Sequence, residues 1–347
     1  MSSRNNFCMS VDFGTSNTLV FSRGEGVVVN QASLLAVRTA HQKNQTMSVY
    51  EAGSQVAALV GKTSSDISVE SPLNAGVIQD TELAKILLQI LTEKFLPWSR
   101  HLPFSHSGKG ILISAPCEIT EYERNAFYEA ARSLGFARVG LIDEPLSAAL
   151  GAGLELFKPS GQMLVDLGSG ITEAVVIGSG GVVQSGSFRQ GGNDVDAAIV
   201  QYLIDQHQFE IPRGLAKEIK ERFCGAGSKF DPEPVQISGK CVHEKLPRKK
   251  MIHAAEFSEC IQEYVSRVQT LILSVLEKSE PELVSDIMES GIWLSGGGAL
   301  LQGLPEALTQ RLQIPVRKVE DPLGAVIKGS GKVVADPELS SLCRAIN

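Results

Sequence analysis

Two short segments of the sequence carry the same arrangement of residues that could bind phosphate. Residues 12–21 read DFGTSNTLVF and residues 166–177 read DLGSGITEAVVI. In both, glycine stands two positions after the aspartate, a hydroxyl residue three positions after it and threonine six positions after it. A strand that ends in aspartate and turns tightly through glycine points consecutive backbone N–H groups inward, and such a nest binds phosphate oxygens. The matched pairs are Asp12 and Asp166, Gly14 and Gly168, Thr15 and Ser169, and Thr18 and Thr172.

The presence of two copies is stronger evidence for a phosphate site than either copy alone. One such turn alone is typical of an ordinary hairpin. Two copies at corresponding places in two halves predict a clamp that holds a polyphosphate from both sides. Asp12 and Asp166 would then meet near a Mg²⁺ ion, which keeps several waters and takes few direct carboxylates.

A third glycine-rich turn occurs within residues 292–312, IWLSGGGALLQGLPEALTQRL. An apolar strand is expected to run into Gly296, Gly297 and Gly298, followed directly by a helix. A turn of this kind lets a ligand approach the backbone at a helix N-terminus, although it is equally typical of tight packing. It matches neither G-x-G-x-x-G nor a P-loop. The expected apolar stripe of the helix is Ala299, Leu300, Leu304, Leu308 and Leu312.

A carboxylate at a strand end is the fourth candidate. Residues 139–155 read VGLIDEPLSAALGAGLE, in which a strand reaches Asp143 and Glu144 before a helix of small residues. Glu144 could orient an attacking water. A charge that the helix dipole stabilises is the alternative reading.

Composition narrows the class of protein. The 347 residues are 43% hydrophobic and 20% charged, a globular balance with room for about two domains. The net charge of −7 argues against a nucleic-acid partner. Six cysteines without a C-x-x-C pair, and no secretory signal, favour free thiols in the cytoplasm. No apolar run approaches the roughly 20 residues needed to cross a bilayer.

The motifs together resemble the MreB family, the bacterial actin-like rod shape-determining proteins. DFGTSNTLVF is similar to its first phosphate loop, DLGSGITEAVVIGSGGVVQSGSFRQGGNDVDAAI to its second, LIDEPLSAALGAG to its connecting helix and LSGGGALLQGL to its adenosine loop. The resemblance implies an α/β, actin-like (ribonuclease H-like) ATPase fold. Two duplicated domains, each with a large and a small subdomain, would surround a nucleotide cleft. The expected subdomains are 1–32, 75–150 and 322–347 (IA), 33–74 (IB), 151–192 and 251–321 (IIA), and 193–250 (IIB).

The resemblance also implies a ligand set of ATP and Mg²⁺. The catalytic candidates are Glu144, which would orient the hydrolytic water, and Asp12 and Asp166, which would hold Mg²⁺ through water. Lys217 and Lys220 would flank the nucleoside, although on spacing alone they are typical of a solvated basic face. The remaining implied nucleotide contacts are Gly14, Thr15, Ser16, Asn17, Gly168, Ser169, Gly170, Gly296, Gly297, Gly298 and Ala299.

The implied function is a cytoskeletal one. Protomers would stack head-to-tail into filaments at the inner face of the cytoplasmic membrane and determine rod shape by organising cell-wall synthesis with its membrane proteins. Ile171 stands where the family has a threonine that helps to hold the attacking water, and an apolar side chain cannot hydrogen-bond to water. We therefore expect slow ATP hydrolysis with binding and polymerisation intact. Asn193 also departs, since the family usually has aspartate there.

Membrane contact is expected from a loop within residues 93–110, EKFLPWSRHLPFSHSGKG. Apolar and aromatic tips beside cations suit the lipid headgroup region. The same side chains could instead cap the domain core. The tips are Phe95, Leu96, Trp98, Leu102 and Phe104.

Three rival functions are compatible with paired D-x-G turns. A sugar or acetate kinase of the same superfamily generally needs a longer chain and a catalytic base beside a second-substrate pocket. A chaperone-type ATPase needs a substrate-binding domain after the nucleotide unit. A non-polymerising adaptor would bind nucleotide without forming filaments.

Overall fold

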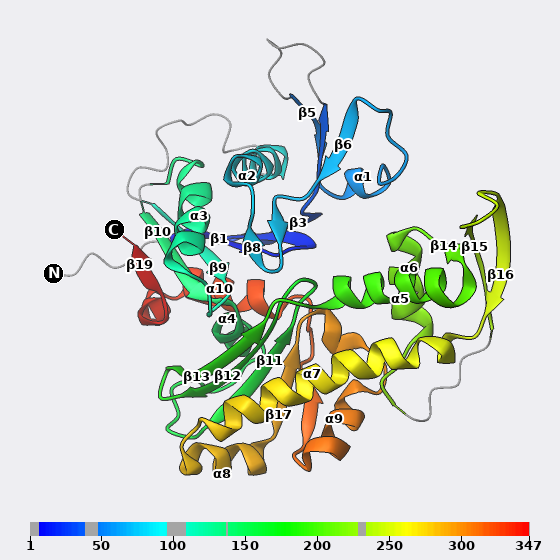
Figure 1. The fold of residues 1–347 in the computed structure, drawn as a ribbon. Helices are drawn as coiled ribbons and strands as arrows, with labels where there is room; N and C mark the ends of the chain where they lie inside the picture. Colours follow the sequence, from blue (N-terminus) through cyan, green and yellow to red (C-terminus); the bar gives the residue numbers. More distant parts are fainter. Residues whose placement is uncertain (1–6, 39–47, 96–108, 137, 228–233, 347) are drawn as a thin grey trace. The chain divides into compact units, whose positions relative to one another are not determined.

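The structure is a computed structural model that describes residues 7–38, 48–95, 109–136, 138–227 and 234–346 (Figure 1). The chain forms two compact units. Unit 1 comprises residues 1–158, 179–182 and 324–347, and unit 2 comprises residues 159–178 and 183–323.

Unit 1 is built on a mixed six-stranded sheet of order β19-β10-β9-β1-β2-β3. β1 pairs antiparallel with β2 and parallel with β9, and β9 pairs parallel with β10. The central strand β9 is buried at every position, as expected where a sheet is covered on both faces. Their bounds are β1 Phe7–Phe13, β2 Asn17–Ser22, β3 Gly26–Ala32, β9 Gly110–Ala115, β10 Arg138–Asp143 and β19 Arg344–Ile346.

Four longer helices pack in unit 1. α2 and α3 pack against each other, and α3 lies on β9 and β10. A capping box between Thr120 and Glu123 fixes the start of α3. α4 lies so close to α10 that a Cβ on Gly151 would be 1.9 Å from the carbonyl oxygen of Ala325. The bounds are α2 Thr81–Phe95, α3 Glu121–Arg132, α4 Glu144–Gly151 and α10 Ala325–Ala335.

Smaller elements complete unit 1. A three-stranded sheet of order β5-β4-β6, with the short helix α1, lies within the range expected for subdomain IB, and the boundaries of all four subdomains stay a prediction. The elements are β4 Leu35–Arg38, β5 Ser48–Ala52, α1 Ser54–Ala57, β6 Ile67–Glu70, β7 Leu73–Asn74, β8 Val77–Ile78 and η4 Pro337–Leu342.

Unit 2 repeats the plan of unit 1. Its five-stranded sheet has the order β13-β12-β11-β17-β18, which matches β3-β2-β1-β9-β10 strand for strand. β11 pairs antiparallel with β12 and parallel with β17, as β1 does with β2 and β9. The duplication inferred from the sequence is therefore present in the topology. The strands are β11 Gln162–Leu167, β12 Thr172–Gly178, β13 Gly181–Phe188, β17 Ile292–Ser295 and β18 Val316–Lys318.

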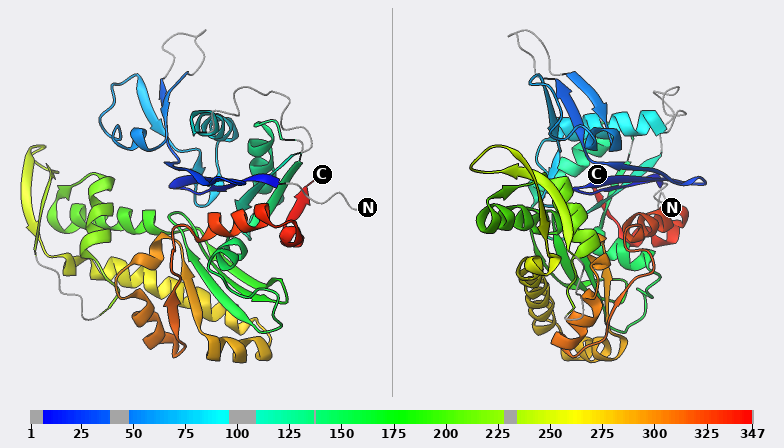
Figure 2. Two further views of the ribbon diagram at one scale, coloured as in Figure 1. Left: turned by 180° about the vertical axis from the view of Figure 1, so that it is seen from behind. Right: turned by 90° about the vertical axis from the view of Figure 1, so that its right-hand side faces the viewer.

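Helices cover this sheet and carry a second small sheet. The long helix α7 packs on β12, and α8 packs on β11. α5 and α6 lie side by side and lead to the three-stranded sheet β14-β15-β16 (Figures 1 and 2). The elements are α5 Gly192–His207, β14 Phe209–Glu210, α6 Arg213–Phe223, β15 Val235–Cys241, β16 Pro247–Ile252, η2 Ala254–Phe257, α7 Ser258–Glu277, α8 Pro281–Ser290, η3 Gly297–Leu300 and α9 Leu304–Leu312.

One expected element is wrong. The single helix predicted to follow Gly298 is two elements, the 3₁₀ turn η3 and the helix α9. The break spans residues 301–303, where Leu301 has a ψ of 124° and ends the 3₁₀ turn, and Gly303, with a left-handed φ of 70°, precedes α9. Leu300 is consequently 46% exposed and does not belong to the apolar stripe, whereas Leu304 and Leu308 are buried.

No helix in the described part of the chain is both long enough and apolar enough to cross a bilayer. All six cysteines carry free thiols.

Candidate functional site

The first candidate phosphate turn, in unit 1, is closed by backbone hydrogen bonds. The Gly14 N–H donates to the Asn17 carbonyl oxygen at 3.1 Å. A Cβ on Gly14 would lie 3.0 Å from that oxygen, so a side chain would crowd the turn. Ser33 ties the turn to the end of β3, because its N–H donates to the Ser16 carbonyl and its hydroxyl to the Gly14 carbonyl. The Thr15 hydroxyl accepts from the Gly76 N–H at 3.0 Å.

The second candidate turn, in unit 2, has the same construction. The Gly168 N–H donates to the Ile171 carbonyl at 2.9 Å, and a Cβ on Gly168 would lie 2.8 Å from that oxygen. The matched threonines also correspond. Thr18 Oγ1 lies 2.9 Å from Ser33 Oγ after β3, and Thr172 Oγ1 donates to a backbone carbonyl, that of Gln190, at 2.9 Å after β13. The two turns thus share their hydrogen-bond geometry as well as their sequence.

Tyr264 of α7 contacts the threonine that follows the second turn. Its hydroxyl lies 3.0 Å from Thr172 Oγ1. Burial raises the pKa of Tyr264 to about 12, so this hydroxyl stays protonated and available as a donor at neutral pH.

The two candidate aspartates occupy equivalent places, each opposite a serine of the neighbouring parallel strand. Asp12 aligns with Ser114, and Asp166 aligns with Ser295. The Ser295 hydroxyl donates to Asp166 Oδ1, and burial raises the pKa of the Asp166 carboxyl despite that bond. Asp12 is half-buried. The buried Ser114 Oγ has no hydrogen-bond partner among the residues that the structure describes.

The glycine-rich turn after β17 lies against the second phosphate turn. Gly296 has a φ of 76°, and a Cβ there would be 2.5 Å from the carbonyl oxygen of Leu167. A Cβ on Gly298 would be 2.7 Å from the Leu167 Cβ, and Ala299 is buried. Since Leu167 immediately precedes Gly168, the structure brings these two predicted ligand segments together within unit 2.

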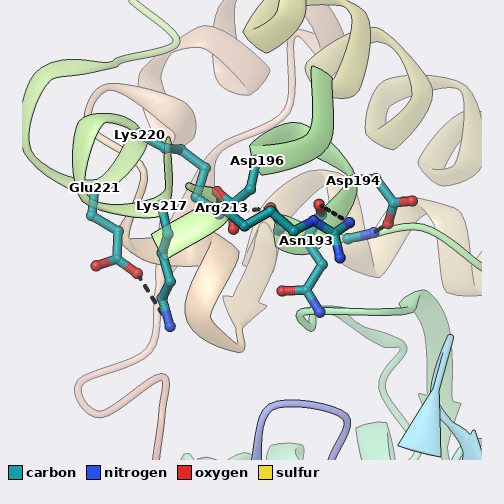
Figure 3. Close-up of polar contacts among 9 residues, drawn as sticks. Asn193, Asp194, Asp196, Arg213, Lys217, Lys220 and Glu221 are labelled. Atoms are coloured by element: carbon teal, nitrogen blue, oxygen red, sulfur yellow. Dashed lines mark hydrogen bonds and ion pairs between the residues drawn. The ribbon is translucent and has the colours of Figure 1, made fainter. Parts of the chain in front are cut away.

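The two candidate lysines of α6 have different surroundings (Figure 3). Lys220 Nζ lies 2.7 Å from Asp196 Oδ1 and donates to the Gly192 carbonyl at 2.7 Å. The side chain of Lys217 is 50% exposed and lies 3.9 Å from Glu221. The structure therefore joins Lys220, but not Lys217, to the start of α5.

Sequence reasoning missed the residues that build this start of α5. The Gly191 N–H donates to Asp194 Oδ2 at 2.8 Å, and Arg213 Nη2 donates to the Asn193 carbonyl at 3.4 Å (Figure 3). A signal was available in the sequence QGGND, because paired glycines followed by aspartate are typical of a capped helix N-terminus. Asn193, which departs from the family pattern, uses its backbone in these contacts.

Glu144 begins α4, immediately after β10. It is 8% exposed. Asp143 aligns with Ala115 and Asp12 with Ser114, so Glu144, which follows Asp143, lies at the same edge of the sheet as Asp12, where parallel β1 and β10 end. That edge also bears the first phosphate turn, which places the three features together within unit 1.

The predicted membrane loop is not tested. Leu96, Trp98, Leu102 and Phe104 lie outside the described residues, and Phe95 ends α2 with its side chain outside them.

Comparison with known proteins assigns the chain to a family. A model of the MreB/Mbl protein family matches residues 6–341. The chain belongs to the MreB/Mbl family. The cell shape-determining protein MreB of Escherichia coli K12 is 35% identical over 326 residues, which span 94% of this chain and 92% of that protein.

Solved structures agree with this MreB/Mbl assignment. MreB5 of Spiroplasma citri bound to AMPPNP matches with a TM-score of 0.86 at 31% identity, covering 94% of this chain and 95% of that one. The MamK double helical filament matches with a TM-score of 0.77 at 19% identity, over 94% of this chain and 98% of that one, and shows the fold alone. The predicted actin-like α/β fold is thereby confirmed.

Proposed function

We propose that this MreB/Mbl chain binds ATP with Mg²⁺ through its two duplicated phosphate turns. The observation that carries the proposal is the matched pair of turns, in which Gly14 and Gly168 make the same backbone hydrogen bond and leave no room for a Cβ. Backbone N–H groups exposed in such turns bind phosphate oxygens. The bound AMPPNP in the related Spiroplasma citri structure supports the same ligand class.

The residues present fit a magnesium nucleotide. The two glycine turns offer cradles that a side chain would fill, and Ser114 Oγ is a buried polar atom without a described partner beside Asp12. Asp12 and Asp166 would hold the ion through water, as Mg²⁺ prefers. Magnesium would neutralise charge on the phosphates. Glu144, buried at the edge that carries Asp12, would orient the hydrolytic water.

Binding of ATP would promote the assembly of protomers into filaments. Protomers of the actin-like fold would stack head-to-tail, and such a heterologous contact, when it does not close on itself, produces an open filament. In the cytoplasm these filaments would lie on the inner face of the membrane and organise cell-wall synthesis with its membrane proteins. The curated MreB relative is named for determining cell shape.

High-speed sedimentation tests the filament directly. With Mg·ATP most of the protein should pellet, and negative-stain microscopy of the pellet should show filaments, whereas protein without nucleotide should stay in the supernatant. Nucleotide binding without pelleting would identify an adaptor. Release of ADP accelerated by a sugar or an organic acid would identify a kinase.

The membrane loop is proposed as the contact with lipid. Apolar and aromatic tips at Phe95, Leu96, Trp98, Leu102 and Phe104 suit the headgroup region. Replacing Trp98 and Phe104 together with serine should abolish co-sedimentation with liposomes while ATP-dependent pelleting alone persists. If the double variant still follows the liposomes, the loop is not the anchor.

A further inference from the structure

The amine of Lys220 is occupied by groups of the protein itself. Lys220 Nζ lies 2.7 Å from Asp196 Oδ1 and 2.7 Å from the Gly192 carbonyl oxygen. Its side chain is only 15% exposed and that of Asp196 only 6%. The ammonium group thus donates a hydrogen bond to Gly192 and forms an ion pair with the buried Asp196, so its charge is already engaged within the protein.

This ion pair joins two neighbouring helices. Asp196 lies in the second turn of α5 and Lys220 in the last turn of α6 (Figure 3). A buried carboxylate loses solvation, and removing its partner leaves an uncompensated buried charge. The pair therefore fixes how the start of α5 is placed against α6.

The start of α5 in turn contacts the second phosphate turn. The Gly192 N–H donates to the Gly168 carbonyl at 3.1 Å, and the Asn193 N–H donates to the Ser169 carbonyl at 2.9 Å. A Cβ on Gly191 would lie 2.3 Å from the Gly168 carbonyl oxygen, so the two backbones touch. A shift of α5 would necessarily move Gly168 and Ser169.

Lys217 offers a contrast on the same helix. Its side chain is 50% exposed, and its neighbour Glu221 is 58% exposed at 3.9 Å. Exposed pairs of this kind contribute little. The burial and short contacts of Lys220 are therefore not a general feature of the basic residues on α6.

We propose that Lys220 and Asp196 are a positioning pair, which holds the N-terminus of α5 so that the backbone N–H groups of Ser169 and Gly170 stay in phosphate-binding geometry. The proposal rests on the nucleotide site proposed above and changes the role of Lys220 from nucleoside contact to support of the phosphate turn. A turn that is ordered before the ligand arrives loses less entropy on binding, and affinity rises accordingly.

Three variants test the pair: K220M, D196N and the double variant. Both single variants should weaken ATP binding by about 10-fold or more, and the double variant should be no weaker than the worse single variant, because the two residues act as one unit. The matched control is R222Q on α6, whose side chain is 64% exposed, pairs along the helix with Glu218 and lies over the neighbouring Phe223 ring. R222Q should bind ATP as the wild type does.

Titrations with two partial ligands distinguish a pair that positions the phosphate turn from a lysine that contacts the nucleoside. Inorganic tripolyphosphate and adenosine are titrated separately, the first by calorimetry and the second by ligand-observed NMR. Each variant of the pair should lose tripolyphosphate affinity and keep adenosine affinity within about 2-fold, since RT ln 2 is only about 0.4 kcal/mol. Equal loss of both ligands would overturn the positioning role, because a nucleoside contact or general unfolding moves both.

Hydrogen exchange provides a second measurement on folded protein without ligand. D196N should accelerate exchange of the hydrogen-bonded amides of Gly168, Gly192 and Asn193 by about 10-fold or more relative to R222Q, because exchange reports local opening. Unchanged exchange in D196N, or wild-type ATP affinity in both single variants, would reject the inference while the nucleotide site stands. Failure of the wild type to bind ATP and tripolyphosphate would remove both proposals.

Discussion

Replacing Asp166 with asparagine should abolish magnesium-dependent ATP binding and make the nucleotide-free protein more stable. Asp166 is 6% exposed, and its described bond comes from the hydroxyl of Ser295. An ionised carboxylate in this position loses solvation that one hydroxyl does not replace. Asparagine keeps an oxygen that can accept from Ser295 and removes the charge. We expect the free energy of unfolding to rise by about 0.5–2 kcal/mol, in the range seen when a strained functional site is relieved.

The gain in stability expected for D166N depends on pH. Burial raises the pKa of Asp166 in the folded protein above its ordinary value of 3.8. Between the unfolded and the folded pKa the folded state binds more protons than the unfolded state, so the wild type loses stability as pH rises through that window. Below the window the carboxyl is protonated in both states, and Asp166 imposes no penalty. D166N should therefore match the wild type at the low-pH end and exceed it at neutral pH.

Urea unfolding at several pH values, with and without Mg·ATP, measures both effects. D205N is the matched control, because Asp205 is exposed on α5 and its carboxylate accepts from Gln201 of the same helix. D205N should behave as the wild type throughout. A D166N protein that is less stable than the wild type at neutral pH, or that retains the full stabilisation by Mg·ATP, would contradict the assigned role of Asp166.

Replacing Ile171 with threonine should accelerate phosphate release by about 10-fold or more, the scale on which a positioned hydrogen-bonding group contributes. Ile171 is 5% exposed, and its carbonyl already closes the second phosphate turn by accepting from Gly168. The backbone of the turn is therefore independent of the side chain, and only the hydroxyl is added. The same hydroxyl is buried, so we expect a loss of stability of about 1–2 kcal/mol.

Single-turnover phosphate release at saturating ATP isolates the chemical step of this I171T variant. I171V serves as the control, since it shortens the side chain without adding a donor or acceptor, and its rate should match the wild type. ATP affinity should be similar in all three proteins. An unchanged rate in I171T with intact binding would show that the apolar residue does not limit hydrolysis.

Local patterns were sufficient to predict several backbone features of the candidate site. The D-x-G turns, the glycine-rich turn after β17 and the placement of Glu144 all depend on backbone geometry that a few consecutive residues determine. The repeat of the strand order in the two sheets follows from the repeat of these segments. Features that depend on a few consecutive residues can therefore be predicted from the sequence.

Contacts between distant segments could not be read in the same way. Lys220 and Asp196 are separated by 24 positions, and Asp166 and Ser295 by 129 positions. The spacing on α6 predicted that Lys217 and Lys220 share a face. It could not predict that Lys220 lies 2.7 Å from the buried Asp196 carboxylate, whereas Lys217 lies 3.9 Å from the exposed Glu221. The split between η3 and α9 was missed because the apolar stripe continues across residues 301–303, where the backbone of Leu301 is extended and that of Gly303 is left-handed.

An experimental structure of the protein with Mg·AMPPNP would test the paired turns most directly. We expect backbone N–H groups of the Gly14 turn and of the Gly168 turn to lie about 2.7–3.2 Å from phosphate oxygens of the same nucleotide. A nucleotide held by one turn alone, with the other turn remote from it, would contradict the account.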